Sequence, residues 1–455
     1  MKIIIVGCGK VGKTLAEELN KEDNEVTVID RRYAEVESLS NKFDVMGVVG
    51  NGASYKTQME AGIEKADILI AVTGSDELNL LCCLIAKRAG NCQTIARVRN
   101  PEYSEEIGFV KGALGLAMTI NPEFAAAQEI ARVLRFPSAI KIDTFAKGRV
   151  EMLKFRVPGE SRLNGMLVMN IAPKLGADVL VCAVERDGEI FIPKGDFRLQ
   201  EKDVVSIIAG PKKASDFFKK IGIETHQVKD TMIVGGGDTG YYLAKLLQPM
   251  GIGIKLIEQN EERCNLLSEL LPKAQIIHAD GSEQIVLIEE GVGQAEAFVA
   301  LTNIDEENVM LSLFARSQTS GKIATKINRM DFDRVIKELD LDTTVYPKKI
   351  TAQYILQFVR AMKNSIGCNV ETMYRILDDK AEALEFVVKE SSELPGIPLE
   401  KLKIKENTLV ACIIRGRQII IPRGKDEMRV GDSVVVVTTT LGLKDIRDVI
   451  SVRKQ

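Results

Sequence analysis

Residues 2–12 read KIIIVGCGKVG, a strand-length apolar run that enters a glycine-rich turn. The GxGxxG spacing of the glycines suits a tight turn, close approach of the backbone to a pyrophosphate, and a helix whose N-terminus faces the anion. We therefore predict a dinucleotide-binding strand–turn–helix unit at the start of an α/β sheet. The loop residues expected in its site are Gly7, Cys8, Gly9, Lys10, Val11 and Gly12.

The same opening occurs a second time, 228 residues further along the chain. There the apolar run 231–234 precedes a glycine turn of the same spacing, Gly235, Gly237 and Gly240. Other anchors recur 228 or 229 residues later: Asp30 as Glu258, Thr73 as Thr302, Asp76 as Asp305, and Asn79 as Asn308. So many recurrences predict two copies of one nucleotide-binding module, and chemistry essential to its function should occur in both.

Length and composition exclude several classes of protein. The 455 residues, 45% hydrophobic and 27% charged, suffice for about three or four domains. The formal net charge of -3 gives no electrostatic reason to expect a nucleic-acid partner. Apolar runs are shorter than the ~20 residues that span a bilayer, and Gly7 interrupts the first run, so no export signal is visible. We expect a cytoplasmic protein with no direct membrane insertion.

Cysteine and histidine usage argues against a metal site. The eight cysteines form no CxxC pair and do not recur at the repeat spacing, which favours buried, reduced thiols. The only histidines are His226 and His278. We therefore expect no bound metal.

The pattern of strands and helices predicts four lobes and a linker. In each half, apolar runs alternate with amphipathic segments, which predicts a Rossmann-like, doubly wound parallel sheet, the N-lobe. A helix that begins at Pro122 or Pro347 follows each sheet. Short β-rich runs then predict a small α+β C-lobe, of a size that often pairs with a partner. The predicted division is 1–137 N-lobe 1, 138–221 C-lobe 1, 222–230 linker, 231–366 N-lobe 2 and 367–455 C-lobe 2.

The first glycine turn also matches the P-loop pattern GxxxxGK[ST] through Lys13 and Thr14. In a P-loop the lysine and the hydroxyl contact the terminal phosphates and Mg²⁺. The second copy has Tyr241 and Tyr242 at those positions, whereas both copies share the glycines. The shared residues favour the dinucleotide interpretation over the P-loop, and a structural glycine turn without a ligand stays open.

Polar residues at the ends of neighbouring strands should complete the first site, since ligands of open α/β sheets bind beyond the carboxyl ends of the strands. Asp30 closes the second strand, where a carboxylate accepts ribose hydroxyls and repels a 2′-phosphate; this favours NAD(H) over NADP(H), although Arg31 beside it weakens the preference. The other expected site residues are Asn51, Gly52, Thr73, Gly74, Ser75, Arg97 and Arg99. For Ser75 a helix N-cap is an equal alternative, and for the two arginines a solvated strand end.

The glycine loop of the second copy differs from the first at a position that bears on its ligand. Asp238 replaces Lys10 inside the glycine loop, and a carboxylate beside a phosphate is unfavourable unless it turns away or caps the helix. Glu258 still offers a ribose acceptor. Weak nucleotide binding, a different nucleotide, or no ligand all stay open.

Neither copy shows an evident catalytic group. A nicotinamide dehydrogenase needs an acid or base beside the substrate. His278 has Val49 as its counterpart, and Tyr241 with Lys245, spaced as in short-chain reductases, lies on the helix after the glycine loop. The absence of an acid or base common to both copies favours a nucleotide sensor that is not an enzyme; a soluble NAD-dependent oxidoreductase with an unrecognised active site is the alternative.

Taken together, the motifs resemble those of the TrkA family, the cytosolic subunits of bacterial and archaeal Trk-type potassium uptake systems, built from tandem RCK (KTN) domains. The resemblance covers essentially the whole chain. Its motifs are KIIIVGCGKVG, VTVID, GNGAS, AVTGSDELN, IARVRNPEY and INPE, with MIVGGGDTG, HADGS and ALTNIDEENV in the second half.

The resemblance implies a homotetrameric ring on the inner face of the cell membrane, attached through a membrane-embedded Trk-type potassium channel subunit. It also implies gating regulated by NAD(H) or by ATP/ADP. Carried over, the glycines of the first loop, Asp30 and Thr73 would bind the first nucleotide, with Arg97 and Arg99 near its phosphates. We hypothesise that Arg99 makes the contact that favours one ring shape, because its counterpart is the uncharged Asn328.

Overall fold

The computed structural model describes residues 1–450 except 102, 104–105, 137–138, 147–148, 224–227, 330–332, 340, 365–369, 377–379, 391–393 and 444. His226, Cys368, part of the predicted linker, and the predicted lobe boundaries at 137–138 and 366–367 lie outside the described residues. The chain divides into two compact units, residues 1–131 with 228–356, and residues 132–227 with 357–455. Each unit therefore combines equivalent parts of the two repeats: one holds the N-lobes and the other the C-lobes.

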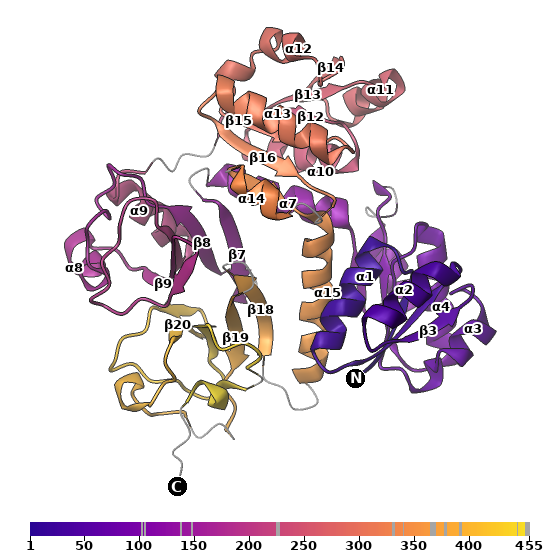
Figure 1. The fold of residues 1–455 in the computed structure, drawn as a ribbon, viewed down its shortest axis with the longest axis horizontal. Helices are drawn as coiled ribbons and strands as arrows, with labels where there is room; N and C mark the ends of the chain where they lie inside the picture. The colour runs from indigo at the N-terminus through magenta and orange to yellow at the C-terminus, as the bar shows by residue number, and fades with distance from the viewer. Residues whose placement is uncertain are drawn as a thin grey trace. The chain divides into compact units, whose positions relative to one another are not determined.

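N-lobe 1 is a parallel sheet of six strands in the order β3-β2-β1-β4-β5-β6, as predicted for a doubly wound fold (Figure 1). The strands are β1 Lys2–Val6, β2 Glu25–Asp30, β3 Met46–Val49, β4 Ile68–Ala71, β5 Gln93–Arg97 and β6 Met118–Ile120. The helices are α1 Lys10–Lys21, α2 Tyr33–Lys42, α3 Tyr55–Glu60, α4 Asp76–Ala89, α6 Ile107–Leu114 and α7 Pro122–Arg135.

N-lobe 2 repeats this sheet in the order β14-β13-β12-β15-β16-β17, again with parallel pairing. Its strands are β12 Asp230–Val234, β13 Gly253–Glu258, β14 Gln275–His278, β15 Ala297–Ala300, β16 Lys322–Lys326 and β17 Thr343–Val345. Its helices are α10 Asp238–Leu247, α11 Glu261–Leu270, α12 Gln284–Glu289, α13 Asp305–Gln318, α14 Asp333–Glu338 and α15 Pro347–Asn364. The duplication predicted from sequence is therefore a duplication of structure.

The strands of both N-lobes are continuous apolar runs in the sequence because they are buried on both faces of the sheet. All of β4 is buried, and so are four of the five residues of β1, because helices cover both faces of a parallel sheet. On one face, Ile4, Val6 and Leu69 pack with Cys83 and Ala86 of α4. The sixth strands, β6 and β17, have three residues each, which is too few to show a strand pattern in the sequence.

The C-lobes are antiparallel sheets of five strands with the same order, β7-β8-β11-β9-β10 and β18-β19-β22-β20-β21. C-lobe 1 contains β7 Lys141–Phe145, β8 Val150–Arg156, β9 Leu180–Arg186, β10 Glu189–Phe191, β11 Val204–Ala209, α8 Ile171–Leu175 and α9 Pro211–Lys220. C-lobe 2 contains β18 Val370–Ile376, β19 Ala381–Val387, β20 Thr408–Arg415, β21 Gln418–Ile420 and β22 Ser433–Thr438. Where α9 follows β11, a 3-10 helix at Ile446–Val449 follows β22.

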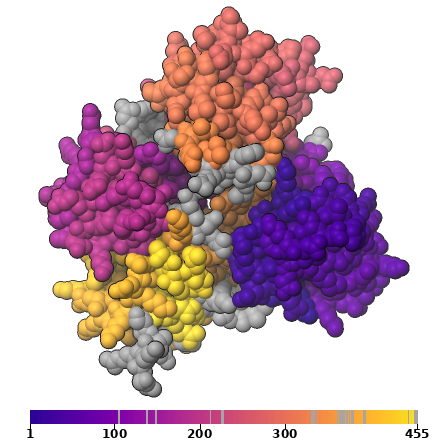
Figure 2. Space-filling model, viewed as in Figure 1, coloured from indigo at the N-terminus to yellow at the C-terminus, as the bar shows by residue number. Residues whose placement is uncertain are grey.

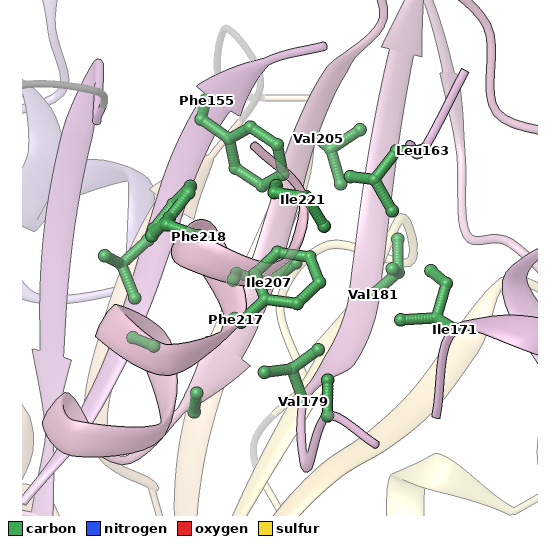
Figure 3. Packing of buried hydrophobic residues seen from close by; sticks show 14 of the residues in the cluster. Phe155, Leu163, Ile171, Val179, Val181, Val205, Ile207, Phe217, Phe218 and Ile221 are labelled. Carbon is green, nitrogen blue, oxygen red and sulfur yellow. The ribbon is translucent and has the colours of Figure 1, made fainter. Parts of the chain in front are cut away.

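The core of C-lobe 1 combines aromatic and aliphatic side chains on the face that α9 covers (Figure 3). Phe217 and Phe218 of α9 are buried, and the Phe218 ring meets Phe155 of β8 edge-on, with ring centroids 5.0 Å apart. Such contacts add to the free energy gained by burying the rings. The helix is thereby fixed to the sheet.

The two C-lobes pair with each other through a shared core, in agreement with the expectation that lobes of this size often pair with a partner. Phe145 and Met152 of C-lobe 1 belong to one buried cluster with Ala383 and Val435 of C-lobe 2. At this contact the backbone N–H of Ala146 donates to Glu385 at 3.1 Å. Figure 2 shows the magenta and yellow surfaces of the two lobes in direct contact.

The seven described cysteines are buried and free, as predicted. Burial raises the pKa of Cys8, Cys82 and Cys412 to about 12. Among the described residues, no three potential metal ligands cluster, and no helix is long and apolar enough to cross a bilayer.

Candidate functional site

A cleft of about 510 Å³, here the first cleft, opens at the carboxyl ends of β1, β2 and β4. Parallel α/β sheets bind ligands at this edge, where the strand order reverses. Eleven of the predicted site residues line it: Gly7, Gly9, Lys10, Val11, Asp30, Arg31, Asn51, Gly52, Thr73, Gly74 and Arg97. The predicted set therefore converges on one place, although the role of each residue in binding stays a prediction.

The three glycines of the loop meet different packing needs. Gly7 has φ +104°, a backbone conformation that L side chains rarely adopt. A Cβ on Gly12 would lie 1.8 Å from the carbonyl oxygen of Gly7, because α1 starts directly against the turn. Gly9, by contrast, opens onto the cleft, with no heavy atom within 4 Å of an added Cβ. Gly12 thus supports the loop from behind, and Gly9 faces the ligand space.

Asp30 holds the glycine loop with its carboxylate. Its Oδ2 accepts the backbone N–H of Cys8 at 2.7 Å, and its Oδ1 accepts the backbone N–H of Arg32 at 3.0 Å. Glu258 does the same in the second copy, accepting from Gly236 at 2.7 Å and from Asn260 at 2.9 Å. A carboxylate can accept about four hydrogen bonds, so Asp30 retains capacity for a ribose hydroxyl while it orders the loop.

Asn79 organises the rim of the first cleft, a role that the sequence analysis missed. Its Oδ1 accepts the backbone N–H of Thr73 at 2.7 Å, and its Nδ2 donates to the carbonyl of Arg97 at 2.9 Å. Asn308 makes the same two contacts, with Thr302 and Lys326. The recurrence of Asn79 at the repeat spacing was the available signal, but spacing alone does not show that the side chain bridges two strand ends.

Ser75 is a helix cap and does not line either cleft. Its Oγ accepts the backbone N–H of Leu78 at 3.1 Å, which is the N-cap geometry of α4. Asp76 likewise accepts the backbone N–H groups of Arg99 and Asn100, at 2.7 and 2.8 Å. The alternative interpretation of Ser75 as an N-cap is therefore confirmed.

Arg99 and Arg97 are separated, contrary to the expectation that both approach the first nucleotide. Arg97 lines the first cleft, and its guanidinium donates to the carbonyl of Thr73. Arg99 donates to the carbonyl of Gly74 at 2.8 Å and lines the cleft of the other N-lobe. Residues two apart on a strand point to the same side, so the separation of positions 97 and 99 comes from the path of the chain after β5 ends at Arg97. Arg99 is thus placed at a different cleft from the one predicted.

The second cleft, of about 650 Å³, lies at the equivalent edge of N-lobe 2. Gly235, Gly237 and Glu258 line it, while Gly240 packs behind the loop, with an added Cβ 2.2 Å from the carbonyl oxygen of Gly235. The carboxylate of Asp238 forms an ion pair with the guanidinium of Arg263, with 3.3 Å between Oδ1 and Nη2. It therefore turns toward a cation, one of the two arrangements expected for a carboxylate in this loop. The guanidinium of Arg263 also donates to the carbonyl of Gly236 at 2.8 Å, so the glycine loop of this cleft already has a charged side chain bonded to it.

The two clefts differ in the sign of their charge. The described lining of the first cleft holds five cationic side chains and one acidic one: Lys10, Arg31, Arg32, Arg97 and Lys348, with Asp30. The described lining of the second holds three cationic and five acidic ones: Arg99, Arg263 and Lys326, with Glu123, Asp238, Glu258, Asp280 and Glu307. The charge of the first cleft therefore favours binding of an anion. The charge of the second cleft does not.

The two N-lobes exchange side chains within their unit. Tyr242 of α10 donates to the carbonyl of Arg99 at 3.1 Å, accepts from Asn121 at 3.0 Å, and meets the ring of Phe124 edge-on at 5.4 Å. Position 242, where the P-loop pattern of the first copy has Thr14, is thus an inter-lobe contact. Tyr241 is buried beside Lys245, with 3.2 Å between Oη and Nζ, and neither residue is among the described lining of either cleft.

Comparison with known proteins identifies the family. The TrkA-N domain matches residues 3–122 and 231–347, and the TrkA-C domain matches residues 152–222 and 383–451. The chain is 32% identical over 454 residues to Trk system potassium uptake protein TrkA homolog 1 of Methanosarcina mazei, covering 98% of this chain and 99% of that protein. It is 30% identical over 452 residues to Trk system potassium uptake protein TrkA of Halomonas elongata, covering 99% and 98%.

Solved structures share the fold. The GsuK channel bound to NAD matches with a TM-score of 0.62 at 17% identity, over 96% of this chain and 77% of that chain. The GsuK RCK domain matches with a TM-score of 0.63 at 17% identity, over 96% and 92%. With tandem TrkA-N and TrkA-C domains along its length and curated relatives at about a third identity over nearly all of it, the chain belongs to the TrkA family of Trk-system potassium uptake proteins.

Proposed function

We propose that the chain is a regulatory subunit of a Trk-type potassium uptake system, which binds NAD(H) or ATP/ADP in the first cleft and thereby gates a membrane-embedded channel subunit. The observation that carries the proposal is the first cleft itself. Its glycine loop has backbone N–H groups and cationic side chains for a diphosphate, and Asp30 is held at the strand end where a ribose is bound in dinucleotide folds. The family membership supplies the potassium transport system.

Gating requires that the nucleotide bind one shape of the assembly better than another. Moving an assembly from 1:99 to 99:1 takes about 5.5 kcal/mol of differential affinity, or about 1.4 kcal/mol per site if four sites act additively. One charge-assisted hydrogen bond per site is of this size. The cationic first cleft has several groups able to supply it.

We propose that copies of the chain form a homotetrameric ring through the α3–α4 and α12–α13 faces of the N-lobes. Large apolar side chains are exposed there at similar places in both repeats: Tyr55, Leu81 and Leu84 in the first, Ile285, Ile288 and Met310 in the second. Leu81 and Met310 hold the same position in the two repeats, and exposed apolar groups on corresponding helices favour a repeated protein contact. Such a ring would lie in the cytoplasm, peripheral to the membrane through its channel partner.

Calorimetry with NADH, NAD, ATP and ADP tests the proposal on the wild-type chain, Asp30→Ala and the matched variant Glu258→Ala. Asp30→Ala should weaken binding at the first cleft by about 1–3 kcal/mol, the cost of losing hydrogen bonds to a charged acceptor. Glu258→Ala makes the same change in the second cleft and should leave the tight site intact. An isotherm unaltered by Asp30→Ala would contradict the assignment of the first cleft.

The second cleft takes a nucleotide less readily in this proposal, because acidic side chains predominate in its described lining and Arg263 already occupies its glycine loop. A loss of binding stoichiometry in Glu258→Ala would show that it is nevertheless a site. Steady oxidation of NADH against a metabolite would favour the oxidoreductase, and copurification of a multi-span membrane protein would favour the sensor.

A further inference from the structure

Lys348 belongs to N-lobe 2 but lines the cleft of N-lobe 1. It is the second residue of α15, directly after Pro347. Pro347 lines the second cleft, whereas Lys348 lines the first, so the start of this helix lies between the two clefts. Lys348 is half-buried, and its Nζ donates to the carbonyl of Asn328, two residues beyond β16, which fixes the side chain in this position.

Lys348 faces other cations across the first cleft. Burial, and next the positive charge of Lys10, lower the pKa of Lys348 to about 8; Arg329 acts in the same direction and Asp305 against it. Lys10 comes from the glycine loop of N-lobe 1, so two ammonium groups from different lobes meet at one place. Bringing like charges together costs free energy, which an anion bound between them would recover.

The equivalent residue of N-lobe 1 is exchanged in the same manner but has the opposite charge. Glu123 follows Pro122 at the start of α7, as Lys348 follows Pro347, and it lines the second cleft. At this position of the repeat, each N-lobe thus contributes an ionisable side chain to the cleft of the other. The first cleft receives a cation and the second an acid.

We propose that Lys348 is a ligand-binding residue of the first cleft, which contacts the diphosphate of the bound nucleotide together with Lys10 and so ties occupancy of N-lobe 1 to the position of N-lobe 2. The proposal rests on the proposed function in one respect, that a nucleotide binds in the first cleft. It adds a specificity: both N-lobes contact the diphosphate, while the adenosine part is bound by N-lobe 1 alone.

The proposal is tested by measuring how tightly ADP and adenosine bind to Lys348→Gln. Binding of adenosine is measured by its displacement of NADH. ADP should bind about tenfold more weakly to Lys348→Gln than to the wild type, the factor that corresponds to one charge-assisted contact, and adenosine should bind equally to both. Lys348→Arg should retain most of the affinity for ADP. Lys349→Gln removes the same charge at the next position of α15, which is not in the described lining of either cleft, and should leave ADP binding unchanged.

Hydrogen exchange of residues 343–356 gives a second readout that loss of affinity alone would not produce. At saturating ADP this segment should become protected in the wild type and stay unprotected in Lys348→Gln. Unchanged ADP affinity in Lys348→Gln would overturn the proposal, and so would equal weakening of ADP and adenosine, which would indicate altered packing between the lobes. If the wild type bound no nucleotide, the proposed function would fail with it, so the two failures are distinguishable.

Discussion

Gly12 and Gly9 make a matched pair of substitutions that separates the structural demands of the loop from its ligand demands. A methyl group on Gly12 would lie 1.8 Å from the carbonyl oxygen of Gly7 and 3.0 Å from its carbonyl carbon. Non-bonded heavy atoms prefer about 3.5–4.0 Å, so α1 and the turn after β1 would have to separate by well over an ångström. Both neighbours are backbone, and no flexible side chain is present to yield.

Gly12→Ala should therefore lower the free energy of unfolding of the N-lobes by about 3 kcal/mol, at the upper end of the cost of overpacking. Gly9→Ala should change it by less than about 1 kcal/mol, because an added Cβ meets no heavy atom within 4 Å and Gly9 has φ -68°, which alanine adopts freely. The methyl group of the alanine would point into the first cleft, so Gly9→Ala should weaken NADH binding while the fold is retained.

Urea unfolding followed by circular dichroism, with NADH titrations on the same samples, measures both effects. The second copy supplies an internal replicate, since a Cβ on Gly240 would lie 2.2 Å from the carbonyl oxygen of Gly235, and one on Gly237 would meet nothing within 4 Å. The reasoning would be refuted if Gly12→Ala unfolded at the same urea concentration as the wild type, or if Gly9→Ala were the less stable variant.

Two further predictions concern buried charges. Burial lowers the pKa of Lys322 to about 8 from 10.5, against the attraction of Asp342, so the unfolded chain holds this proton more tightly. Stability should accordingly rise with pH between about 8 and 10.5 by at most about 3 kcal/mol, and Lys322→Met should remove that rise in a series of urea titrations. Glu385→Ala should destabilise the paired C-lobes by about 1–3 kcal/mol, because the buried N–H of Ala146 loses its acceptor; a thermal midpoint unchanged from the wild type would contradict this.

The sequence was sufficient for the features that depend on local chain geometry. The glycine spacing and the alternation of strands and helices determine the turn, the parallel sheet and the end of the sheet at which ligands bind. The repeat spacing predicted that Glu258 does what Asp30 does, and both carboxylates accept the N–H of the second residue of their glycine turn. These contacts join positions fixed by one strand and the turn beside it.

Features that depend on the packing of separate segments could not be predicted in the same way. Arg97 and Arg99 are two residues apart, but only the path of the chain after β5 decides that they line different clefts. The hypothesis that Arg99 acts on the first nucleotide was based on its uncharged counterpart Asn328, which does not indicate that Arg99 lines the other cleft. Lys348 is about 340 residues from the loop that it faces, and no periodicity connects the two.

The exchange of Glu123 and Lys348 gives a physical reason for the duplication within one chain. In a symmetric dimer of a single module, each cleft would receive the same side chain from its neighbour, so both clefts would have the same charge. Covalent linkage of two copies removes this constraint, because the residue after the proline can differ between them. One position can then add a cation to the first cleft and an acid to the second, which widens the difference in charge that the other lining residues of the two clefts already make.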